Sequence, residues 1–592
     1  MVAVVQDALS QLLAMVGLDE ANLKILVCTL LSFPFSWIFK RLPDHHYSLK
    51  NVYNILVSAF YVFVILDVHS GLGQLLFSAI GCYFITRYVR SPVMPWINFL
   101  FLMGHLFYEH IHMQFFNVYD PTQIDLTGAQ MVMVMKLSAF GWNIHDGKQP
   151  EESLTEYNKS RRVKQHPNLL PYFGYVFFYA SLLTGPAFDY VDYDRFIHGT
   201  LFEDVPDDKR PGRRKRRIPR SGKQSLMKTL EGFFWAFCFA NIGRFVTLEY
   251  LLSKSFVQDH GFLYRIFYFW GLLFSHRLKY YAVWSIAEGA CILSGIGYNG
   301  YDQKTGKFKW NRVQNIDAVA FETGQNVHAC LEAWNMNTNK WLKHYIYLRV
   351  AKSSKKPGFK STLFTFATSA AWHGTRPGYY LTFVSGALMQ SCGKIYRRNL
   401  RPIFMQADGK TPKSTKIVYD IVCYFVTQLT FGQATQPFVI LDFKQSLYAW
   451  STCYYFIHIG MIITIFLFKG PFAKPIIKTC KSFQPSAKVV PNTTSTRFNE
   501  QEADIVKSTA LKAKVDKDNV YYTYATLGLP SIDMLESVDK EDVDDQVKQL
   551  RKAWLTFKAR SVMQNVEDTF HNFTEEVQEI YASSIPKAVK ND

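Results

Sequence analysis

Residues 361–383 read STLFTFATSAAWHGTRPGYYLTF, an apolar run of helix length that contains a single histidine, His373. An ionisable side chain at membrane depth is costly, so by default it is functional and faces a protein interior or a water-filled cavity. Gly374 and Pro377 predict a break just past the histidine, and a membrane tolerates broken backbone only where protein or a cavity covers it. The stretch therefore predicts a functional site inside a membrane protein, on a helix made of two pieces.

The composition indicates a polytopic, all-α integral membrane protein. Aromatic residues make up 16% of the 592 residues, with 49 Phe and 34 Tyr, and mean hydropathy stays near zero because basic loops and a charged tail dilute the apolar blocks. The nine cysteines are scattered without CxxC or paired metal spacing, so we expect no disulfide framework. The N-terminus lacks a basic leader and a cleavage site, which argues against a cleaved signal peptide.

Apolar blocks of the length that crosses a bilayer recur along the chain, and we expect about eleven membrane-spanning helices. The blocks fall at 23–39, 52–67, 71–87, 94–117, 127–143, 168–186, 225–252, 261–283, 284–298, 361–392, 417–441 and 446–468. The composition changes after them, which predicts a multi-span domain over 1–470 and a polar linker with amphipathic helices over 471–592, on the cytosolic side.

Basic residues gather in the connections between these blocks and raise the net charge to +18. The segment 209–223, KRPGRRKRRIPRSGK, carries nine of them and is expected to be a cytosolic loop. It either sets membrane topology alone or also holds phosphate or anionic lipid. Two further clusters bracket the histidine stretch and could hold an anionic cosubstrate at its mouth: Lys352, Lys355, Lys356 and Lys360, and Arg397, Arg398 and Arg401.

A segment rich in asparagine, EAWNMNTNKWL, begins at Glu332, and its Asn335 precedes the histidine by thirty-eight residues. On a helix, Trp334 and Trp341 would share one face and Asn335 and Asn339 another, with Asn337 pointing away. A carboxamide can orient a histidine or hydrogen-bond a developing oxyanion without the desolvation cost of an ion. Spacing alone does not choose between Asn335 and Asn339.

A neutral imidazole at position 373 could accept the proton of an alcohol as that alcohol attacks an acyl carbonyl. The sequence contains no GxSxG motif that would present a serine nucleophile, so direct transfer is favoured over a covalent intermediate. The alternative is a structural histidine with satisfied hydrogen bonds.

Other polar residues lie within apolar blocks. In HLFYEHIHMQFF, Glu109 stands between histidines, but no second motif completes a ligand set, and we expect no metal. Arg277, Lys279 and Glu288 stand among aromatic residues in HRLKYYAVWSIAEGA, where they pair with each other or face a lipid headgroup. The segment LLTGPAFDYVDYDRF from Leu182 is interpreted as the end of a span followed by an acidic turn.

Taken together and in order, LLTGPAFDY, RLKYYAVWSIAEGA, EAWNMNTNKWL and AAWHGTRPGYY resemble motifs of the membrane-bound O-acyltransferase family, and within it of the lysophospholipid acyltransferases. The resemblance covers roughly residues 20–470. It implies a multi-pass enzyme of the endoplasmic reticulum membrane whose helices enclose a tunnel, with acyl-CoA entering from the cytosolic side and the lysolipid from the membrane. The family's histidine corresponds to His373 and its partner asparagine to Asn335, while Glu288 and Trp372 fall on motif positions of less defined role.

The sequence thus predicts an acyl-CoA-dependent lysophospholipid acyltransferase, with acyl-CoA as cosubstrate, no cofactor and no nucleic-acid partner. His373 is the expected general base and Asn335 the expected orienting group or oxyanion donor. The residues expected to bind substrate are Trp334, Asn339, Trp372, Glu288, Arg277 and Lys279. The alternatives are transfer to diacylglycerol, a sterol or a protein, and a lipid transporter, although the inverted repeat of many transporters is not seen.

Overall fold

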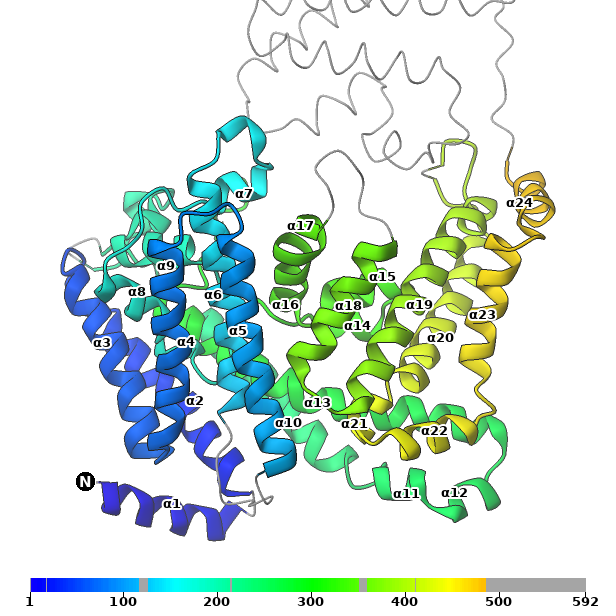
Figure 1. Cartoon of the computed structure of the whole chain (residues 1–592), viewed down its shortest axis with the longest axis horizontal. Helices are drawn as coiled ribbons and strands as arrows, with labels where there is room; N and C mark the ends of the chain where they lie inside the picture. Colours follow the sequence, from blue (N-terminus) through cyan, green and yellow to red (C-terminus); the bar gives the residue numbers. More distant parts are fainter. Residues whose placement is uncertain are drawn as a thin grey trace, which may run out of the picture. The chain divides into compact units, whose positions relative to one another are not determined.

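The computed structural model describes residues 2–16, 19–116, 126–212, 216–350, 359–409 and 411–485. The chain divides into two compact units, Met1–Lys488 and Val489–Asp592, and the described residues all lie in the first. This unit is predominantly helical, as expected (Figure 1). Its described strands form one short antiparallel hairpin, β1 (Tyr301–Asp302) and β2 (Lys307–Phe308). The predicted boundary at residue 470 stays a prediction, and almost all of the predicted tail lies outside the described residues.

The helices before residue 200 are α1 (Val2–Val16), α2 (Glu20–Phe39), α3 (Tyr47–Phe60), α4 (His69–Tyr88), α5 (Met94–Ile111), α6 (Thr127–Gly147), α7 (Glu156–Arg161), α8 (Leu169–Val176) and α9 (Tyr190–His198). The central helices are α10 (Gly222–Ile242), α11 (Leu248–Leu252), α12 (Lys254–Gln258), α13 (Phe262–Ser294), α14 (Ala318–Glu322), α15 (Val327–Ala333), α16 (Met336–Trp341) and α17 (Leu348–Val350). The last helices are α18 (Phe359–His373), α19 (Pro377–Asn399), α20 (Lys416–Ala434), α21 (Pro437–Ile440), α22 (Phe443–Ser451), α23 (Phe456–Lys469) and α24 (Ala473–Ser482). Wider π-helical turns extend three of these segments: η1 (Tyr61–Ile65), η2 (His112–Phe116) and η7 (Leu342–Tyr347).

Tyrosines fill the core of the N-terminal helices. Their rings are buried, and their hydroxyl groups pair with polar partners, as Tyr61 does with Ser32 and Tyr179 with Ser36, each at 2.9 Å. A buried tyrosine needs such a partner because its hydroxyl group has lost water. Small Ser32 and Ser36 on α2 also let neighbouring helices approach closely, as is usual in membrane bundles.

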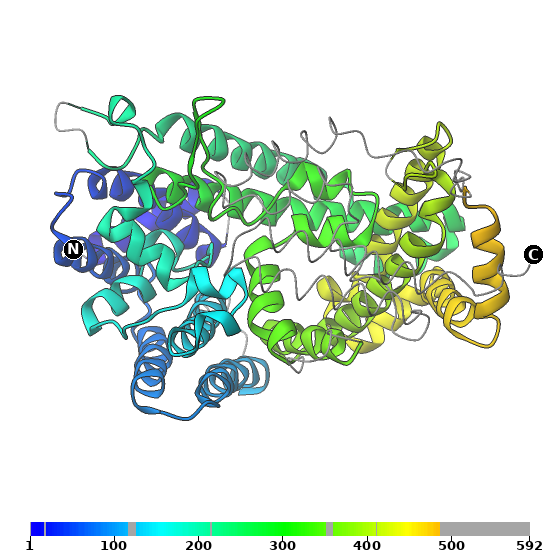
Figure 2. The same cartoon turned by 90° about the horizontal axis from the view of Figure 1, so that it is seen from above.

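Helix α13 connects the two groups of helices within this unit. It packs against α2 and α10 on the N-terminal side and against α20 on the C-terminal side. In the second view the helices of the first third, in blue and cyan, gather at one end, and those after α18, in yellow-green and yellow, at the other (Figure 2). The site is therefore built by segments that are distant in sequence.

Three predicted blocks differ from the structure. The blocks 261–283 and 284–298 are one helix, α13, which contains no proline and continues through Gly271 and Gly289 until Gly295 ends it with a left-handed φ of 112°. The block 168–186 is not a single span. It contains α8 and a 3₁₀ turn (Tyr179–Ser181), followed by the cis bond between Gly185 and Pro186.

Within the described residues, two helical segments are long and apolar enough to cross a membrane, Glu20–Phe39 and Tyr47–Ile65. A third span results if the bent pair Phe443–Ser451 and Phe456–Lys469 is counted as one. The predicted number of about eleven spans is thus not confirmed. One reason is local, because the break after His373 leaves α18 with only 15 residues.

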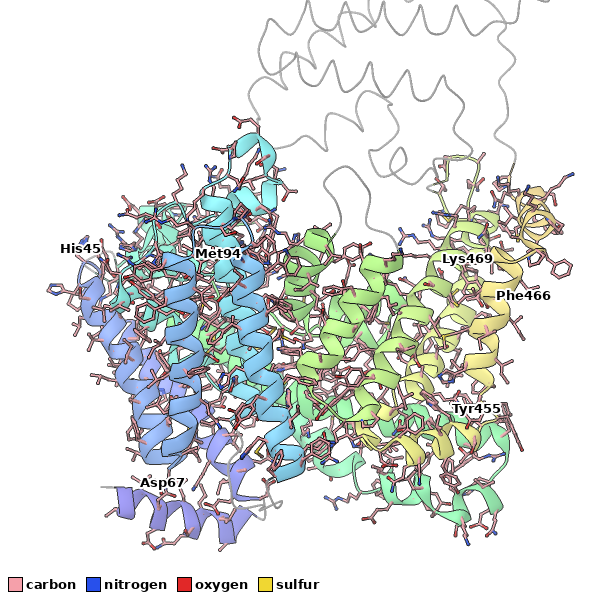
Figure 3. All side chains as sticks on the ribbon, viewed as in Figure 1. His45, Asp67, Met94, Tyr455, Phe466 and Lys469 are labelled. Carbon is pink, nitrogen blue, oxygen red and sulfur yellow. The ribbon has the colours of Figure 1, made fainter. Side chains whose placement is uncertain are left out.

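Several helices nevertheless run between two opposite sides of the unit. His45, Met94 and Lys469 lie toward one side of the unit, and Asp67 and Tyr455 toward the opposite side (Figure 3).

The break between α18 and α19 has the predicted position and cause. Helix α18 ends at His373, Gly374 takes a φ of 137°, and Pro377 begins α19. Gly378 then lets the α21 backbone come close, since its amide donates to the Leu441 carbonyl at 3.0 Å. This close approach brings Phe438 of α21 to 4.9 Å from the His373 ring, between ring centres.

We predict that Gly378→Ala destabilises the protein. A methyl group there would lie 2.1 Å from the Pro437 carbonyl oxygen and 2.7 Å from the Leu441 Cα, and backbone atoms cannot rotate away. Overpacking of this kind costs about 1–3 kcal/mol, which should appear as a lower unfolding temperature of the detergent-solubilised protein. Gly104→Ala on α5 is the matched control, because a methyl group there meets nothing within 4 Å. Equal unfolding temperatures of the two variants would contradict the prediction.

Candidate functional site

A cavity of about 1750 Å³ lies among α13, the α15–α16 segment and helices α18–α21. Its lining is mostly apolar, with Phe366, Phe383, Phe431 and Met461 among the contributors. Basic residues at the end of α19 and the start of α20 line one part of it: Lys394, Arg397, Arg401 and Lys416. A pocket for one small molecule typically measures about 300–1,000 Å³, so this cavity has room for a long-chain ligand together with a second one.

His373 is the last residue of α18 and is partly buried at the cavity wall. Aromatic rings surround it, with Phe383 stacked at 5.3 Å and Phe438 edge-on at 4.9 Å between ring centres. Among the described residues, none hydrogen-bonds the imidazole, so its nitrogens remain available to a ligand in the cavity. In the described part of the chain, His373 therefore has aromatic neighbours but no hydrogen-bond partner for its ring nitrogens.

Asn335 also lines the cavity. It joins α15 to α16 with a φ of 43°, a left-handed conformation that asparagine tolerates better than most residues. The Thr338 hydroxyl donates to Asn335 Oδ1 at 2.8 Å, which orients the carboxamide. Within the described part of the chain the Asn335 Nδ2 has no protein acceptor, so its two N–H groups can donate to a ligand.

The turn at Asn335 corrects the prediction that Trp334 and Trp341 share a helix face. Trp334 follows α15 and packs among Tyr280, Trp284 and Phe321, where it lines the cavity. Trp341 ends α16, and its indole N–H donates to Ser138 on α6 at 2.8 Å. The helix breaks between them because a left-handed residue cannot continue an α-helix.

The other two asparagines have structural partners. Asn337 is buried and points away from the cavity, as predicted, and its Nδ2 donates to the Val313 and Gln314 carbonyls at 3.2 and 3.3 Å. Asn339 lines the cavity, but its Nδ2 donates to the Leu331 carbonyl at 2.9 Å. Spacing did not choose between Asn335 and Asn339. Among the described residues, Asn339 Nδ2 has a protein acceptor and Asn335 Nδ2 has none, so Asn335 is the better candidate donor.

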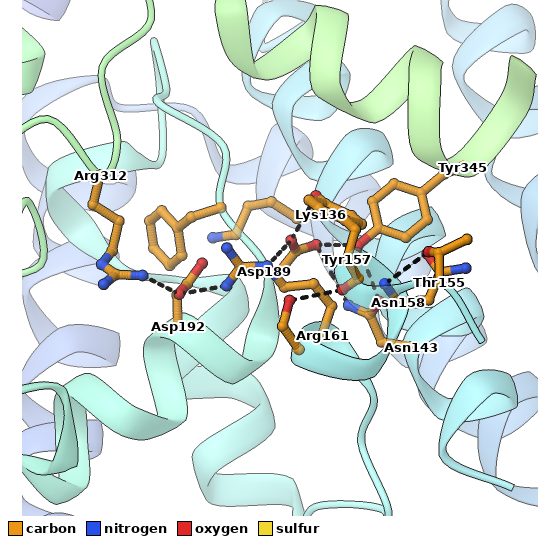
Figure 4. A network of polar contacts seen from close by, with 12 residues as sticks. Lys136, Asn143, Thr155, Tyr157, Asn158, Arg161, Asp189, Asp192, Arg312 and Tyr345 are labelled. Atoms are coloured by element: carbon orange, nitrogen blue, oxygen red, sulfur yellow. Dashed lines mark hydrogen bonds and ion pairs between the residues drawn. The ribbon is translucent and has the colours of Figure 1, made fainter. Parts of the chain in front are cut away.

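A network of buried charges supports the asparagine segment (Figure 4). Residues 313–315 accept the hydrogen bonds of Asn337 and of the Met336 amide, and the neighbouring Arg312 forms an ion pair with Asp192 of α9 at 2.7 Å. Arg161 of α7 pairs with the same Asp192 oxygen at 2.6 Å. The position of Asn335 thus depends on helices more than a hundred residues earlier.

Asp189 extends this network to the turns that follow α16. It accepts a hydrogen bond from the hydroxyl of Tyr345 in η7 at 2.7 Å and lies 3.5 Å from Arg161. From the sequence we interpreted Asp189 and Asp192 only as an acidic turn. Two carboxylates in an otherwise apolar stretch were the available signal, because buried charges are normally paired.

The predicted substrate-binding residues fall into two groups. Trp334, Asn339, Trp372, Arg277 and Lys279 line the cavity. Glu288 lies elsewhere on α13, buried and 3.6 Å from Lys228 of α10. Arg277 does not pair with Lys279 or Glu288. Its guanidinium forms two hydrogen bonds of 2.8 Å with Glu322 of α14.

The histidines of α5 do not form a metal site within the described residues, in which no cluster of metal-ligating side chains is found. His105 instead lies 3.3 Å from Glu109, and the Nε2 of His110 donates to the Trp372 carbonyl at 3.2 Å. The basic cluster at 352–356 lies outside the described residues, as do residues 213–215 of the basic loop.

The fold and the site define a class of protein, a helical membrane protein in which an imidazole and a carboxamide open onto one large apolar cavity. Comparison with known proteins identifies the family. The profile of the membrane-bound O-acyltransferase family matches residues 111–435. The chain therefore belongs to the membrane-bound O-acyltransferase family.

Relatives of this chain carry names that describe phospholipid acylation. A lysophospholipid acyltransferase of Saccharomyces cerevisiae is 45% identical over 97% of this chain and 94% of its own length. A lysophospholipid acyltransferase of Schizosaccharomyces pombe is 41% identical over 80% of this chain and 91% of its own. The membrane-bound glycerophospholipid O-acyltransferase 2 of Homo sapiens is 30% identical over 62% of this chain.

We predict that Asp192→Ala lowers the stability of the protein and weakens its site. The change leaves two largely buried guanidinium groups, those of Arg161 and Arg312, without their shared carboxylate. Removing one partner from a buried ion pair costs roughly 3 kcal/mol or more. Thermal unfolding in detergent measures the effect, and Asp208→Ala, at an exposed pair with Lys209, is the control expected to change little. A wild-type unfolding temperature for Asp192→Ala would show that the network is dispensable.

Proposed function

We propose that the protein transfers a fatty acyl group from acyl-CoA to the free hydroxyl of a lysophospholipid. His373 acts as general base and Asn335 as the donor that stabilises the oxyanion. The observation that carries the proposal is that both side chains line one cavity, each with polar atoms that no described residue occupies. The printed names of the fungal relatives support the same donor and acceptor classes.

The transfer needs no covalent enzyme intermediate. An unprotonated His373 nitrogen takes the proton of the lysolipid hydroxyl while that oxygen attacks the thioester carbonyl carbon. The carbonyl oxygen becomes an oxyanion, which accepts hydrogen bonds from the Asn335 Nδ2. As the intermediate collapses, the C–S bond breaks, CoA leaves as a thiolate, and the imidazolium returns the proton to the solution or to the thiolate. The histidine then ends the cycle neutral.

The rest of the cavity suits these substrates. Its phenylalanines and methionines match the acyl chains, and the basic group at Lys394, Arg397, Arg401 and Lys416 matches the phosphates of CoA. Lys416 is partly neutralised by Asp420 at 2.7 Å, so the arginines are the stronger candidates for phosphate contacts.

The membrane orientation follows from the same basic groups. Figure 1 places the connection between α19 and α20 on the side where α23 ends, and Figure 3 places Lys469 and Met94 on that side. Arg87 and Arg90 stand just before Met94, so basic residues collect there as they do on cytosolic faces. We therefore propose that this side faces the cytosol, that the C-terminal tail leaves from it, and that the membrane is that of the endoplasmic reticulum.

We predict that His373→Ala abolishes most acyl transfer while the protein still accumulates and folds. Loss of a general base typically costs about 10²–10⁴-fold in rate, and lost positioning adds to this. The assay measures CoA release and phospholipid formation by the purified protein from oleoyl-CoA and a lysophospholipid, with diacylglycerol and a sterol as comparison acceptors. Asn335→Asp is expected to lose about 10²-fold or more, since it removes the oxyanion donor.

The control for these variants is Asn339→Asp, whose site also lines the cavity but whose amide group already has a backbone partner. The loss of acyl-transfer rate in Asn339→Asp should be clearly smaller than the loss in Asn335→Asp. If His373→Ala kept most of the wild-type rate, or if a different acceptor were acylated faster than every lysophospholipid, the proposal would be wrong.

We also predict that the double variant Arg397→Gln and Arg401→Gln raises the KM for acyl-CoA. Two phosphate contacts of about 1 kcal/mol each correspond to roughly a thirtyfold change in affinity. The KM for the lysolipid and kcat should change much less, because the arginines lie at and just after the end of α19, whereas His373 precedes its start. Steady-state kinetics at low ionic strength measure this, with Arg244→Gln, just after α10, as an exposed control outside the cavity.

A further inference from the structure

The helix break that presents His373 leaves backbone groups without their usual partners. An α-helix ends with carbonyl groups that no later amide reaches, and these need other donors when they are buried. Because α18 stops at His373, the carbonyl of Trp372 is such a group. It accepts the hydrogen bond from His110 Nε2 at 3.2 Å, across 262 residues of sequence.

Contacts from α5, η2 and α6 hold the chain on both sides of His373. Before it, the Trp372 indole N–H donates to the Met131 carbonyl at 2.9 Å, in addition to the carbonyl contact of His110. After it, the Thr375 hydroxyl donates to Gln114 of η2. We name these three contacts, made by His110, Met131 and Gln114, the helix clasp. Helix α5 packs against α18 along this line.

Gly374 lets the clasp come close. A methyl group on Gly374 would lie 3.3 Å from His110 Nδ1, tighter than nearly all such contacts, and its φ of 137° disfavours any side chain. The His110 ring therefore lies directly against the backbone that follows His373. A carbonyl acceptor at Nε2 also requires that His110 carries its proton on that nitrogen.

A second group of hydrogen bonds holds α5 itself one turn earlier. Glu109 accepts from Gln74 of α4 at 2.8 Å and lies 3.3 Å from His105 Nε2. The other nitrogen of His105, Nδ1, lies 2.8 Å from the Ser78 hydroxyl of α4 and 2.8 Å from Nε2 of Gln130 on α6. The end of α5 is thus fixed to both neighbours before it reaches α18, so the clasp is a rigid support.

We propose that His110 is a positioning residue for acyl transfer. Its Nε2–H, donated to the Trp372 carbonyl, fixes the last turn of α18 and so the direction in which the next side chain, His373, enters the cavity. This inference rests on the proposed role of His373 as general base. It assigns a task to the HLFYEHIHMQFF motif, which has no part in the chemistry itself.

The test compares two replacements of His110 in the full-length purified enzyme. His110→Phe keeps a ring of similar size but removes the donor, and a general base displaced by about 1 Å can lose about 10²-fold in rate. We expect kcat to fall about 10- to 100-fold, with the KM values for acyl-CoA and lysolipid nearly unchanged. His110→Gln places an amide N–H near the position of Nε2 and should retain most of the wild-type kcat.

Two further arms distinguish positioning from general damage. In a His373→Ala background, adding His110→Phe should cause no further loss, because a residue that acts through His373 has nothing left to position. His112→Phe is the matched control, since the ring contacts of His112 among the described residues are with Tyr108 and Phe116 of its own segment, at 6.0 Å. If His110→Phe fails to fold, His110→Asn, whose amide is shorter, replaces it with the same expected loss of kcat.

Several results would overturn the inference. These are a kcat near wild type for His110→Phe, an equal loss for His110→Gln and His110→Phe at equal amounts of folded protein, or an additional loss in the His373→Ala background. Failure of the proposed function is a separate result, namely full activity of the His373→Ala variant whatever happens at His110.

Discussion

A backbone break in an apolar environment must have its polar groups satisfied, and this constraint governs the structure around His373. Helix α18 ends at His373, so the carbonyl groups of its last turn have no later helical amide as donor. The fold supplies one donor from α5, His110, and an acceptor from α6 for the Trp372 indole, and a glycine at the break lets His110 approach. The site is accordingly supported by side chains that belong to the first quarter of the chain.

The segment around Asn335 is also held by contacts from distant residues, and here these contacts include ion pairs between charged side chains. Asn335 has a left-handed backbone, and the turns around it are held by hydrogen bonds to residues 313–315 and by Tyr345. These in turn are fixed by ion pairs among Arg161, Asp192 and Arg312. Buried ion pairs contribute little net stability, but breaking one is costly, so they specify geometry more than they stabilise the fold. Precise geometry is what a general base and an oxyanion donor require.

The residues that line the cavity differ from many of the residues that hold His373 and Asn335 in position. The cavity, with its apolar rings and its basic group, is lined mostly by residues after 270. Several of the residues that support His373 and the segment of Asn335 come from α5, α6, α7 and α9, and they act together with Arg312 and Thr338. The region matched by the membrane-bound O-acyltransferase family, 111–435, includes α6, α7, α9, His373 and Asn335, whereas α5 lies almost entirely before it.

Local patterns in the sequence determined the helical class and the break at Gly374 and Pro377, and they marked His373 as a candidate site residue, because each depends on residues close together in the chain. They also predicted that Asn337 points away from Asn335 and Asn339. The predicted number of spans is not confirmed, and the prediction of one helix through Trp334 and Trp341 is wrong. The left-handed backbone of Asn335 and the length of α13 are set by packing and not by periodicity. Only the tertiary structure decided that His110 supports His373, that Arg312 and Asp192 support Asn335, and that Glu288 lies apart from the cavity. The physical reason is distance along the chain: contacts between residues more than a hundred positions apart have no period or spacing that a single sequence can display.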